Sequence, residues 1–215
     1  MRGEASDDFK HVLDVSLNLA AGLPGHVFIG GVAVYLHTVN HRTTQKYAEV
    51  SHDSDVMVSL VDLSVLRDQV EVVANRRLGK QQVIIDGVEI DVYVERQNNL
   101  AVPYDELLAH ASNYNAEHVT MRAACPEHLL VLKLDACLSR RGSAKGDKDE
   151  RDVVRLASLG STFHPELCEP YLGDEHAAVL KQVARSRVFS AMCEYNDHEA
   201  KKLRQTFESF LRKNF

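Results

Sequence analysis

Apolar positions near the start of the chain recur at helical spacing. They lie three or four residues apart: Phe9, Val12, Leu13, Leu17 and Ala20. This spacing gives a helix one apolar face, and Gly22 and Pro24 then end the pattern. A first helix from Asp7 or Asp8 is therefore predicted.

The next segment predicts a strand, a glycine turn and a helix. A short apolar run at 26–29 precedes Gly30-Gly31, and residues 32–39 resume a helical pattern. After a polar loop at 41–51, alternation predicts a strand over 53–60. A helix follows to about residue 77, with Leu63, Leu66, Val70 and Val73 as its buried stripe and Gly79 at its end.

The strongest local signal is a β-hairpin. Residues 82–85 and 88–94 flank Asp86-Gly87, a pair that favours the type I′ turn between antiparallel strands. Alternation in the second strand turns Val88, Ile90, Val92 and Val94 to one face. Asp91 therefore lies on the opposite, polar face.

The pattern becomes mostly helical beyond residue 100. Helices are predicted over 104–110, 126–141, 148–159, 175–195 and 197–213, with one strand over 118–123. The fold class is therefore α+β, a mixed sheet with flanking helices followed by a helical C-terminal half. We place the α/β core at 1–120 and the helical domain at 121–215.

Composition narrows the classes of partner. The formal charge is −6, which gives no global attraction to nucleic acid. Two segments, residues 140–155 and 201–213, are candidates for local contact with nucleic acid, and the alternative interpretation of both is a solvated helix face. No apolar run reaches the roughly 20 residues of a membrane helix, no secretory signal is apparent, and the cysteines show no disulfide framework. A cytoplasmic protein with no membrane partner is expected.

Three acids carry the candidate chemistry. Asp53 and Asp55 are two residues apart on a strand, hence on one face, and Asp91 lies on the polar face of a second strand. If the strands are neighbours, the carboxylates converge, and such oxygen ligands favour Mg²⁺ or Mn²⁺. Gly30 and Gly31 would let backbone N–H groups and a helix N-terminus approach a phosphate.

The order of these motifs resembles the nucleotidyltransferase superfamily related to DNA polymerase beta. The segments are FIGGVAVYL, HDSDVMV and VEIDVYV, and PEHLLVLKLDACLSRR with GDKDERDVVRL resembles the downstream signature of bacterial AbiEii-type toxins; together they cover about residues 26–160. The resemblance implies a nucleotidyltransferase-type sheet, with Asp53 and Asp55 as metal ligands and Asp91 assisting deprotonation of an acceptor hydroxyl. It also implies that Lys133 meets the triphosphate.

Residues beside Lys133 extend this expected nucleotide-binding site. Arg140 lies seven positions later, on the same helical face, so both cations can reach one anion. Asp149 and Asp152 either orient these cations or act as first-turn acids that complement a helix dipole.

The expected function is metal-dependent transfer of a nucleoside monophosphate from an NTP, such as ATP, onto a hydroxyl of RNA, protein or a small molecule. The AbiEii resemblance implies a toxin of a toxin–antitoxin or phage-defence system, with a cognate antitoxin. Two departures from the family pattern, Gly31 in place of serine and Ser54 in place of an apolar residue, leave an inactive binding or regulatory module open. An antibiotic nucleotidyltransferase is a third alternative.

Overall fold

The computed structural model describes residues 7–75, 79–116, 118–160 and 163–215. These form two compact units. Unit 1 comprises residues 1–36 and 49–125, and unit 2 comprises residues 37–48 and 126–215. The division after Cys125 lies close to the expected limit at 120/121, whereas the place of residues 37–48 in unit 2 has no counterpart in the sequence pattern.

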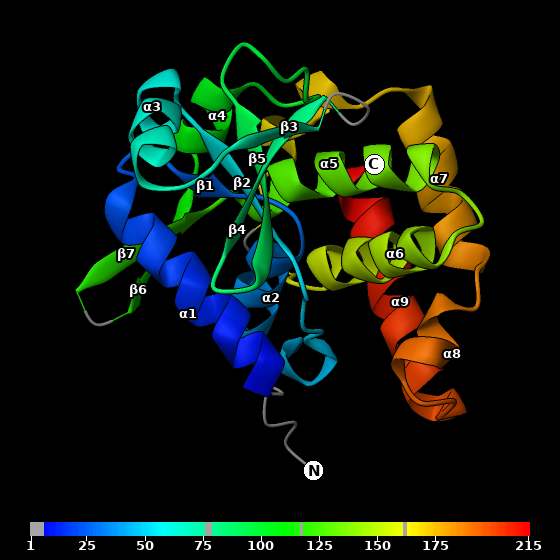
Figure 1. Cartoon of the computed structure of the whole chain (residues 1–215). Helices are drawn as coiled ribbons and strands as arrows, with labels where there is room; N and C mark the ends of the chain where they lie inside the picture. Colours follow the sequence, from blue (N-terminus) through cyan, green and yellow to red (C-terminus); the bar gives the residue numbers. More distant parts are fainter. Residues whose placement is uncertain (1–6, 76–78, 117, 161–162) are drawn as a thin grey trace. The chain divides into compact units, whose positions relative to one another are not determined.

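Unit 1 is built on a seven-stranded mixed sheet with the order β3-β4-β5-β2-β1-β7-β6 (Figure 1). The pairs β2/β5 and β1/β7 are parallel and the other neighbours are antiparallel. The strands are β1 (Val27–Phe28), β2 (Ser54–Val58), β3 (Val73–Asn75), β4 (Lys80–Ile85), β5 (Val88–Val94), β6 (Ser112–Ala116) and β7 (Val119–Ala123).

Three helices complete unit 1, and a fourth leaves it. They are α1 (Asp7–Gly22), α3 (Leu60–Gln69) and α4 (Tyr104–Ala109), while α2 (Gly31–Val39) runs from unit 1 into unit 2. The buried stripe of α1 includes Phe9, Val12 and Leu19, and the helix packs against β7 and β5. The predicted first helix and the helix after the glycine turn are thus confirmed.

The Asp86-Gly87 hairpin is confirmed with the expected register. Both turn residues have positive φ, 49° and 81°, as a type I′ turn requires. Ile85 then pairs with Val88, and Gln82 pairs with Asp91. The side chains of Ile90 and Val92 are fully buried, so the apolar face of β5 lies in the core.

Two expectations for unit 1 were wrong in detail. The predicted helix to residue 77 ends at Gln69; Val70 is extended, and Val73 begins β3, which pairs with β4. β-branched residues pack well in strands, and the neighbouring strand supplies the backbone hydrogen bonds that settle the choice. Residues 76 and 77 lie outside the described part. Strand β6 has the sequence SNYNA, which lacks β-branched residues and apolar alternation, and for that reason its sequence did not predict it.

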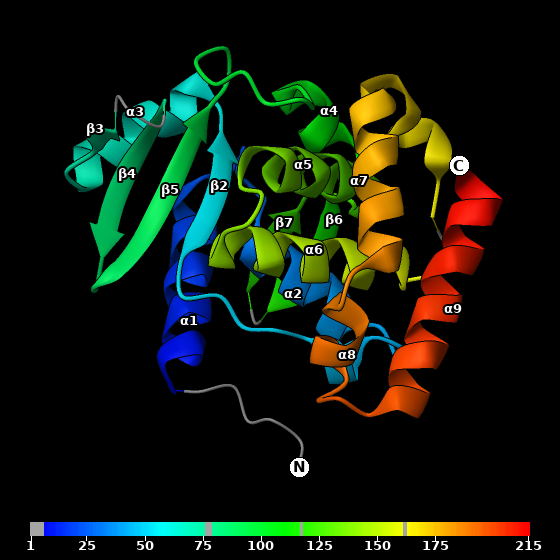
Figure 2. The ribbon, with the colours of Figure 1, turned by 90° about the vertical axis from the view of Figure 1, so that its right-hand side faces the viewer.

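Unit 2 is helical (Figure 2). Its principal helices are α5 (Pro126–Ser139), α6 (Ala144–Ala157), α7 (Asp174–Arg185), α8 (Val188–Met192) and α9 (Asp197–Asn214), with short 3₁₀ turns η1 (Gln45–Tyr47), η2 (Pro165–Leu167) and η3 (Glu169–Tyr171). Helix α5 packs against α6 and α7, and α9 packs against α6, α7 and α8. Among the described helices, none combines the length and the apolar character needed to cross a membrane.

The single helix predicted over 175–195 is two helices. The chain is extended at Ser186, where the guanidinium of Arg204 donates to the carbonyl oxygens of Ala184 and Ser186, both at 3.0 Å. These carbonyls therefore bond to a side chain of α9. The break is a tertiary effect, because the local sequence contains no proline or glycine there.

Candidate functional site

The polar face of the sheet in unit 1 brings two of the predicted acids together. Asp55 and Asp91 are Cα partners in the parallel pair β2/β5, so their side chains leave the same face of the sheet. Asp53 immediately precedes β2. The expectation that the two strands are neighbours is therefore confirmed.

Gly30 permits the glycine turn to approach Asp55. Its φ of 81° is in the left-handed region, and a Cβ at this position would overlap the Asp55 carboxylate. The turn is tied to β2 by a 2.9 Å hydrogen bond from the Ile29 N–H to the Asp55 carbonyl oxygen. Gly31 follows as the first residue of α2, so a helix N-terminus begins beside a carboxylate of the candidate site.

The Asp91 carboxylate already has partners on β4. Lys80 forms an ion pair with its Oδ2, and Gln82 Nε2 donates to its Oδ1 at 3.3 Å. The Lys80 and Asp91 side chains are only 12% and 8% exposed, which keeps this pair largely out of bulk water. The cation beside Asp91 is therefore a lysine of the same sheet.

These contacts decide how well a divalent metal fits. Asp53 Oδ1 accepts a 2.8 Å hydrogen bond from Ser51, and no group of three or more histidine, cysteine or acidic side chains in the described residues is gathered to hold a metal ion. Asp53, Asp55 and Asp91 have the oxygen donors that Mg²⁺ and Mn²⁺ prefer, but Lys80 occupies the third of them. A metal shared by all three acids requires Asp91 to leave Lys80.

Ser54 has a structural role that explains its departure from the family pattern. It is fully buried, and its hydroxyl accepts a 3.1 Å hydrogen bond from Ser16 on α1. Ser54 thus points to the side of α1, while Asp53 and Asp55, one residue away on either side, alternate to the opposite face. A polar residue between the two acids costs the site nothing because its hydroxyl is paired.

In unit 2 the expected phosphate-binding residues form a largely buried ion-pair network. Lys133 Nζ lies 3.1 Å from Asp149 Oδ1 and 2.7 Å from Asp152 Oδ2. Arg140 reaches Asp149 Oδ2 at 3.3 Å, and Arg155 reaches Asp152 Oδ1 at 2.7 Å. Each of the two carboxylates thus contacts Lys133 and one arginine.

Exposure separates the two cations predicted to meet a nucleotide. The Lys133 side chain is 10% exposed and lies between two acids, whereas Arg140 is 47% exposed. Helix α6 begins at Ala144 with Ser143 as its N-cap. Asp149 is therefore past the first turn, and of the two readings of its role the orientation of cations is the one that the geometry supports.

Burial also affects two other side chains. It raises the pKa of the Cys137 thiol to about 12, with Asp149 contributing, which disfavours the reactive thiolate form. Burial lowers the pKa of His26, whose Nδ1 donates to the Leu23 carbonyl oxygen at 2.6 Å and whose Nε2 accepts the Arg122 N–H at 3.0 Å.

Sequence reasoning missed Lys80, Gln82 and Arg155. The hairpin contained the signal for the first two: counting back from the Asp86-Gly87 turn pairs Gln82 with Asp91 and puts Lys80 on the same face. For Arg155 the i, i+3 spacing from Asp152 on one helix was the available signal, whereas its 2.6 Å hydrogen bond to the carbonyl oxygen of Tyr47, 108 residues away, had none.

Comparison with solved structures supports the fold. An antigenic nucleotidyltransferase-like protein from Paracoccidioides brasiliensis superposes with a TM-score of 0.56 at 20% identity, over 87% of this chain and 92% of that one. The Megavirus polyadenylate synthase gives a TM-score of 0.47 at 11% identity, over 71% of this chain and 31% of that one, and adds no argument. No protein-family model matches the sequence, and neither does any curated protein. The chain therefore has a nucleotidyltransferase-like fold, and its likeness to AbiEii-type toxins stays a prediction.

Proposed function

We propose that the protein is a nucleotidyltransferase that moves a nucleoside monophosphate from an NTP onto a hydroxyl acceptor. The observation that carries this proposal is the pairing of Asp55 and Asp91 in register on adjacent parallel strands. Gly30 adds a turn that brings the start of α2 against Asp55. A helix N-terminus with closely approachable backbone N–H groups favours a phosphate.

In this reaction the acceptor hydroxyl attacks the α-phosphorus of the NTP. A bond forms from the acceptor oxygen to phosphorus, the bond from phosphorus to the oxygen bridging to the β-phosphate breaks, and pyrophosphate leaves. Asp91 takes the hydroxyl proton. Gln82 donates to the Asp91 carboxylate on the polar face, and Asp91 leaves its ion pair with Lys80 before it takes the proton. In unit 2, Arg140 is the exposed cation that we propose for a phosphate contact.

Asp53 and Asp55 would hold the Mg²⁺ or Mn²⁺ ion, and Asp91 would join them on separation from Lys80. When bound, the ion would neutralise charge on the phosphates and the carboxylates. In this scheme Lys133 holds the Asp149 carboxylate in place for Arg140. This assignment rests on the 3.1 Å and 3.3 Å contacts of Asp149 with the two cations.

The test is label transfer from each α-³²P-labelled NTP, with Mg²⁺ or Mn²⁺, to RNA, protein and small-molecule pools. Transfer by the wild type and its loss in Asp53→Asn and Asp55→Asn variants is expected. Asp68→Asn, an exposed acid on α3, is the matched control and should retain activity. No transfer by the wild type to any pool, or equal loss in the control, contradicts the proposal.

The Lys80–Asp91 ion pair favours a second candidate, a binding module that keeps the fold without catalysis. If this candidate is correct, calorimetry will show no metal-dependent binding of any NTP. The Lys80→Met variant distinguishes the two. Under the transferase proposal its Mn²⁺ affinity rises because Asp91 is released, whereas a module without a metal site binds no Mn²⁺ with either residue. An antitoxin partner belongs to the toxin version of the proposal and is tested by co-purification with a candidate antitoxin protein.

A further inference from the structure

Unit 2 has a groove along α9. Two hollows of about 430 and 420 Å³ adjoin there and share Gly160, Lys202 and Thr206. The first extends to Lys46 and Tyr47, and the second extends to Lys213. We call this continuous depression the α9 groove. All of its lining residues belong to unit 2.

One face of α9 forms a wall of the groove. Lys202, Thr206, Ser209 and Lys213 follow one another at intervals of four, three and four residues, which places them on one side of a helix. Lys202 and Lys213 are eleven residues apart, a rise of about 16 Å along the axis. A strand with stacked bases rises about 3.4 Å per nucleotide along its axis, so the wall spans roughly five nucleotides of such a strand.

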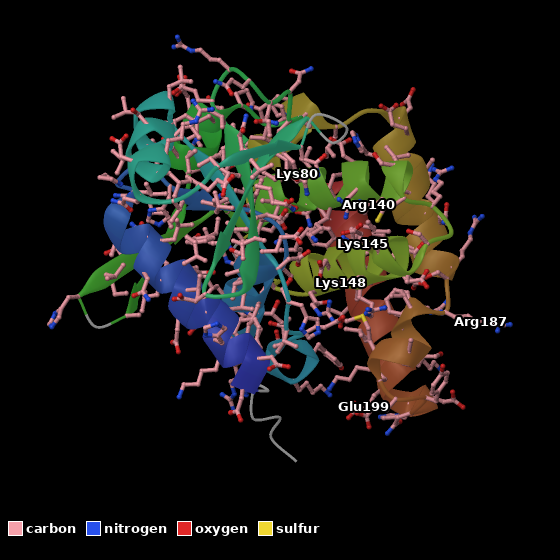
Figure 3. All side chains as sticks on the ribbon, viewed as in Figure 1. Lys80, Arg140, Lys145, Lys148, Arg187 and Glu199 are labelled. Carbon is pink, nitrogen blue, oxygen red and sulfur yellow. The ribbon has the colours of Figure 1, made fainter. Side chains whose placement is uncertain are left out.

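The charged side chains that line the groove are basic. Among the described residues that line it, Lys46, Lys202 and Lys213 are basic and none is acidic. Lys46 forms an ion pair with Glu199 at 3.0 Å, and Glu199 lies near the start of α9 (Figure 3). Lys202 and Lys213 are exposed and form no ion pair with another described residue. The groove therefore favours a polyanion, although the whole chain has a formal charge of −6.

The rest of the lining suits nucleotides better than a lipid surface. Tyr47 is half-buried at one end of the groove, with the Lys46 ammonium 4.8 Å from its ring centroid. Aromatic rings in basic grooves stack on bases without regard to sequence. Thr206, Ser209 and other polar side chains add hydrogen-bonding groups. A groove with an aromatic ring at one end fits a single strand, whereas a helix that binds an anionic membrane buries an exposed apolar face beside its basic residues.

We propose that the α9 groove binds single-stranded nucleic acid, with Lys202 and Lys213 on the phosphates and Tyr47 stacked on a base. This proposal goes beyond the transferase activity and does not depend on it. It concerns unit 2 alone and holds whether or not the chain transfers a nucleotide.

The experiment is fluorescence anisotropy of a fluorescein-labelled 16-nucleotide RNA of mixed sequence, and of the DNA strand of the same sequence, with the full chain. EDTA and the absence of NTP exclude transfer from the readout. Lys202→Ala/Lys213→Ala is expected to weaken binding at least tenfold. It should also reduce the slope of log K against log salt by about 1.4, since each phosphate contact on a single strand contributes about 0.7.

The matched control is Lys181→Ala/Lys201→Ala. It removes the same charge from exposed positions of α7 and α9 that do not line the groove, and it should bind within twofold of the wild type. Tyr47→Ala should weaken binding on the order of tenfold through lost stacking, and Tyr47→Phe should restore it. Thermal melts of all variants check folding.

Two further ligands complete the experiment: a labelled 16-base-pair duplex of the same RNA sequence, and phosphatidylserine vesicles. Four results would overturn the proposal: no binding of the single strand by the wild type, an equal loss in the control pair, equally tight binding of the duplex, or a groove-dependent affinity for the vesicles in place of RNA. Failure of the label-transfer assay with intact RNA binding contradicts only the proposed catalysis. Intact transfer with no strand binding contradicts only the groove.

Discussion

Replacing Lys133 with alanine tests whether this lysine is a structural ion pair or a free ligand-binding cation. The change removes an ammonium that lies 3.1 Å from Asp149 and 2.7 Å from Asp152, both of which are 3% exposed. Two buried carboxylates then keep only their arginine partners, Arg140 and Arg155. Their charge becomes poorly compensated in a region that water hardly reaches.

The magnitude follows from this burial. Removing one partner of a buried ion pair costs about 3–5 kcal/mol. The two arginines compensate part of the charge, so we expect the lower end, about 3 kcal/mol. For a chain of this length each kcal/mol lowers Tm by roughly 2–4 °C. The Lys133→Ala variant should therefore melt about 6–12 °C below the wild type.

Calorimetry without ligand is the assay, and Lys181→Ala is the control. Lys181 is exposed on α7, and such surface changes stay within about 0.5 kcal/mol. In a double-mutant cycle, Lys133→Ala and Asp149→Asn should show a coupling of about 1–3 kcal/mol, because each removes the partner of the other. A Lys133→Ala Tm equal to that of the control, or additive effects in the cycle, would refute the network.

Three further predictions concern other parts of the chain. In urea melts, Gly30→Ala should lower the free energy of unfolding by at least 1 kcal/mol more than Gly87→Ala does. Both glycines have a φ of 81°, so both substitutions incur the left-handed penalty of about 1–2 kcal/mol, but only a Cβ at Gly30 would meet side-chain atoms. Equal losses would contradict this close approach. Burial lowers the pKa of His26, so on acidification the unfolded chain binds a proton at this histidine before the folded chain does. The stability that the neutral ring confers is therefore lost as pH falls below about 6.5. His26→Gln should lessen the fall in unfolding free energy between pH 7.5 and 5.5, and an unchanged fall would refute the assignment. Burial raises the pKa of Cys137 and Cys168 to about 12. After treatment with iodoacetamide at pH 8, mass spectrometry should find both thiols unlabelled in the native protein and labelled in urea. Labelling of the native thiols would count against their burial.

Much of the fold follows from local sequence signals. The Asp86-Gly87 pair predicts a turn with two positive φ angles, and the hairpin has them. Apolar spacing predicts α1, and Pro126 at the first helical position predicts the start of α5. These signals succeed because each depends on backbone preferences within a few residues.

The candidate site was predictable in part for the same reason. Alternation put Asp55 and Asp91 on polar strand faces, and the structure pairs them in register. The ion pair of Lys80 with Asp91 also depends on the hairpin register, which counting from the turn supplies.

Only tertiary structure decided the features that join distant segments. Residues 37–48 belong to unit 2, where the carbonyl oxygen of Tyr47 accepts from Arg155. The predicted helix over 175–195 breaks where the Arg204 guanidinium donates hydrogen bonds to two backbone carbonyl oxygens. The α9 groove combines residues from three separate parts of the sequence. The periodicity of apolar residues predicts which face of a helix or strand is buried. Contacts across the fold decide which element covers that face, and they decide how each buried polar group is paired.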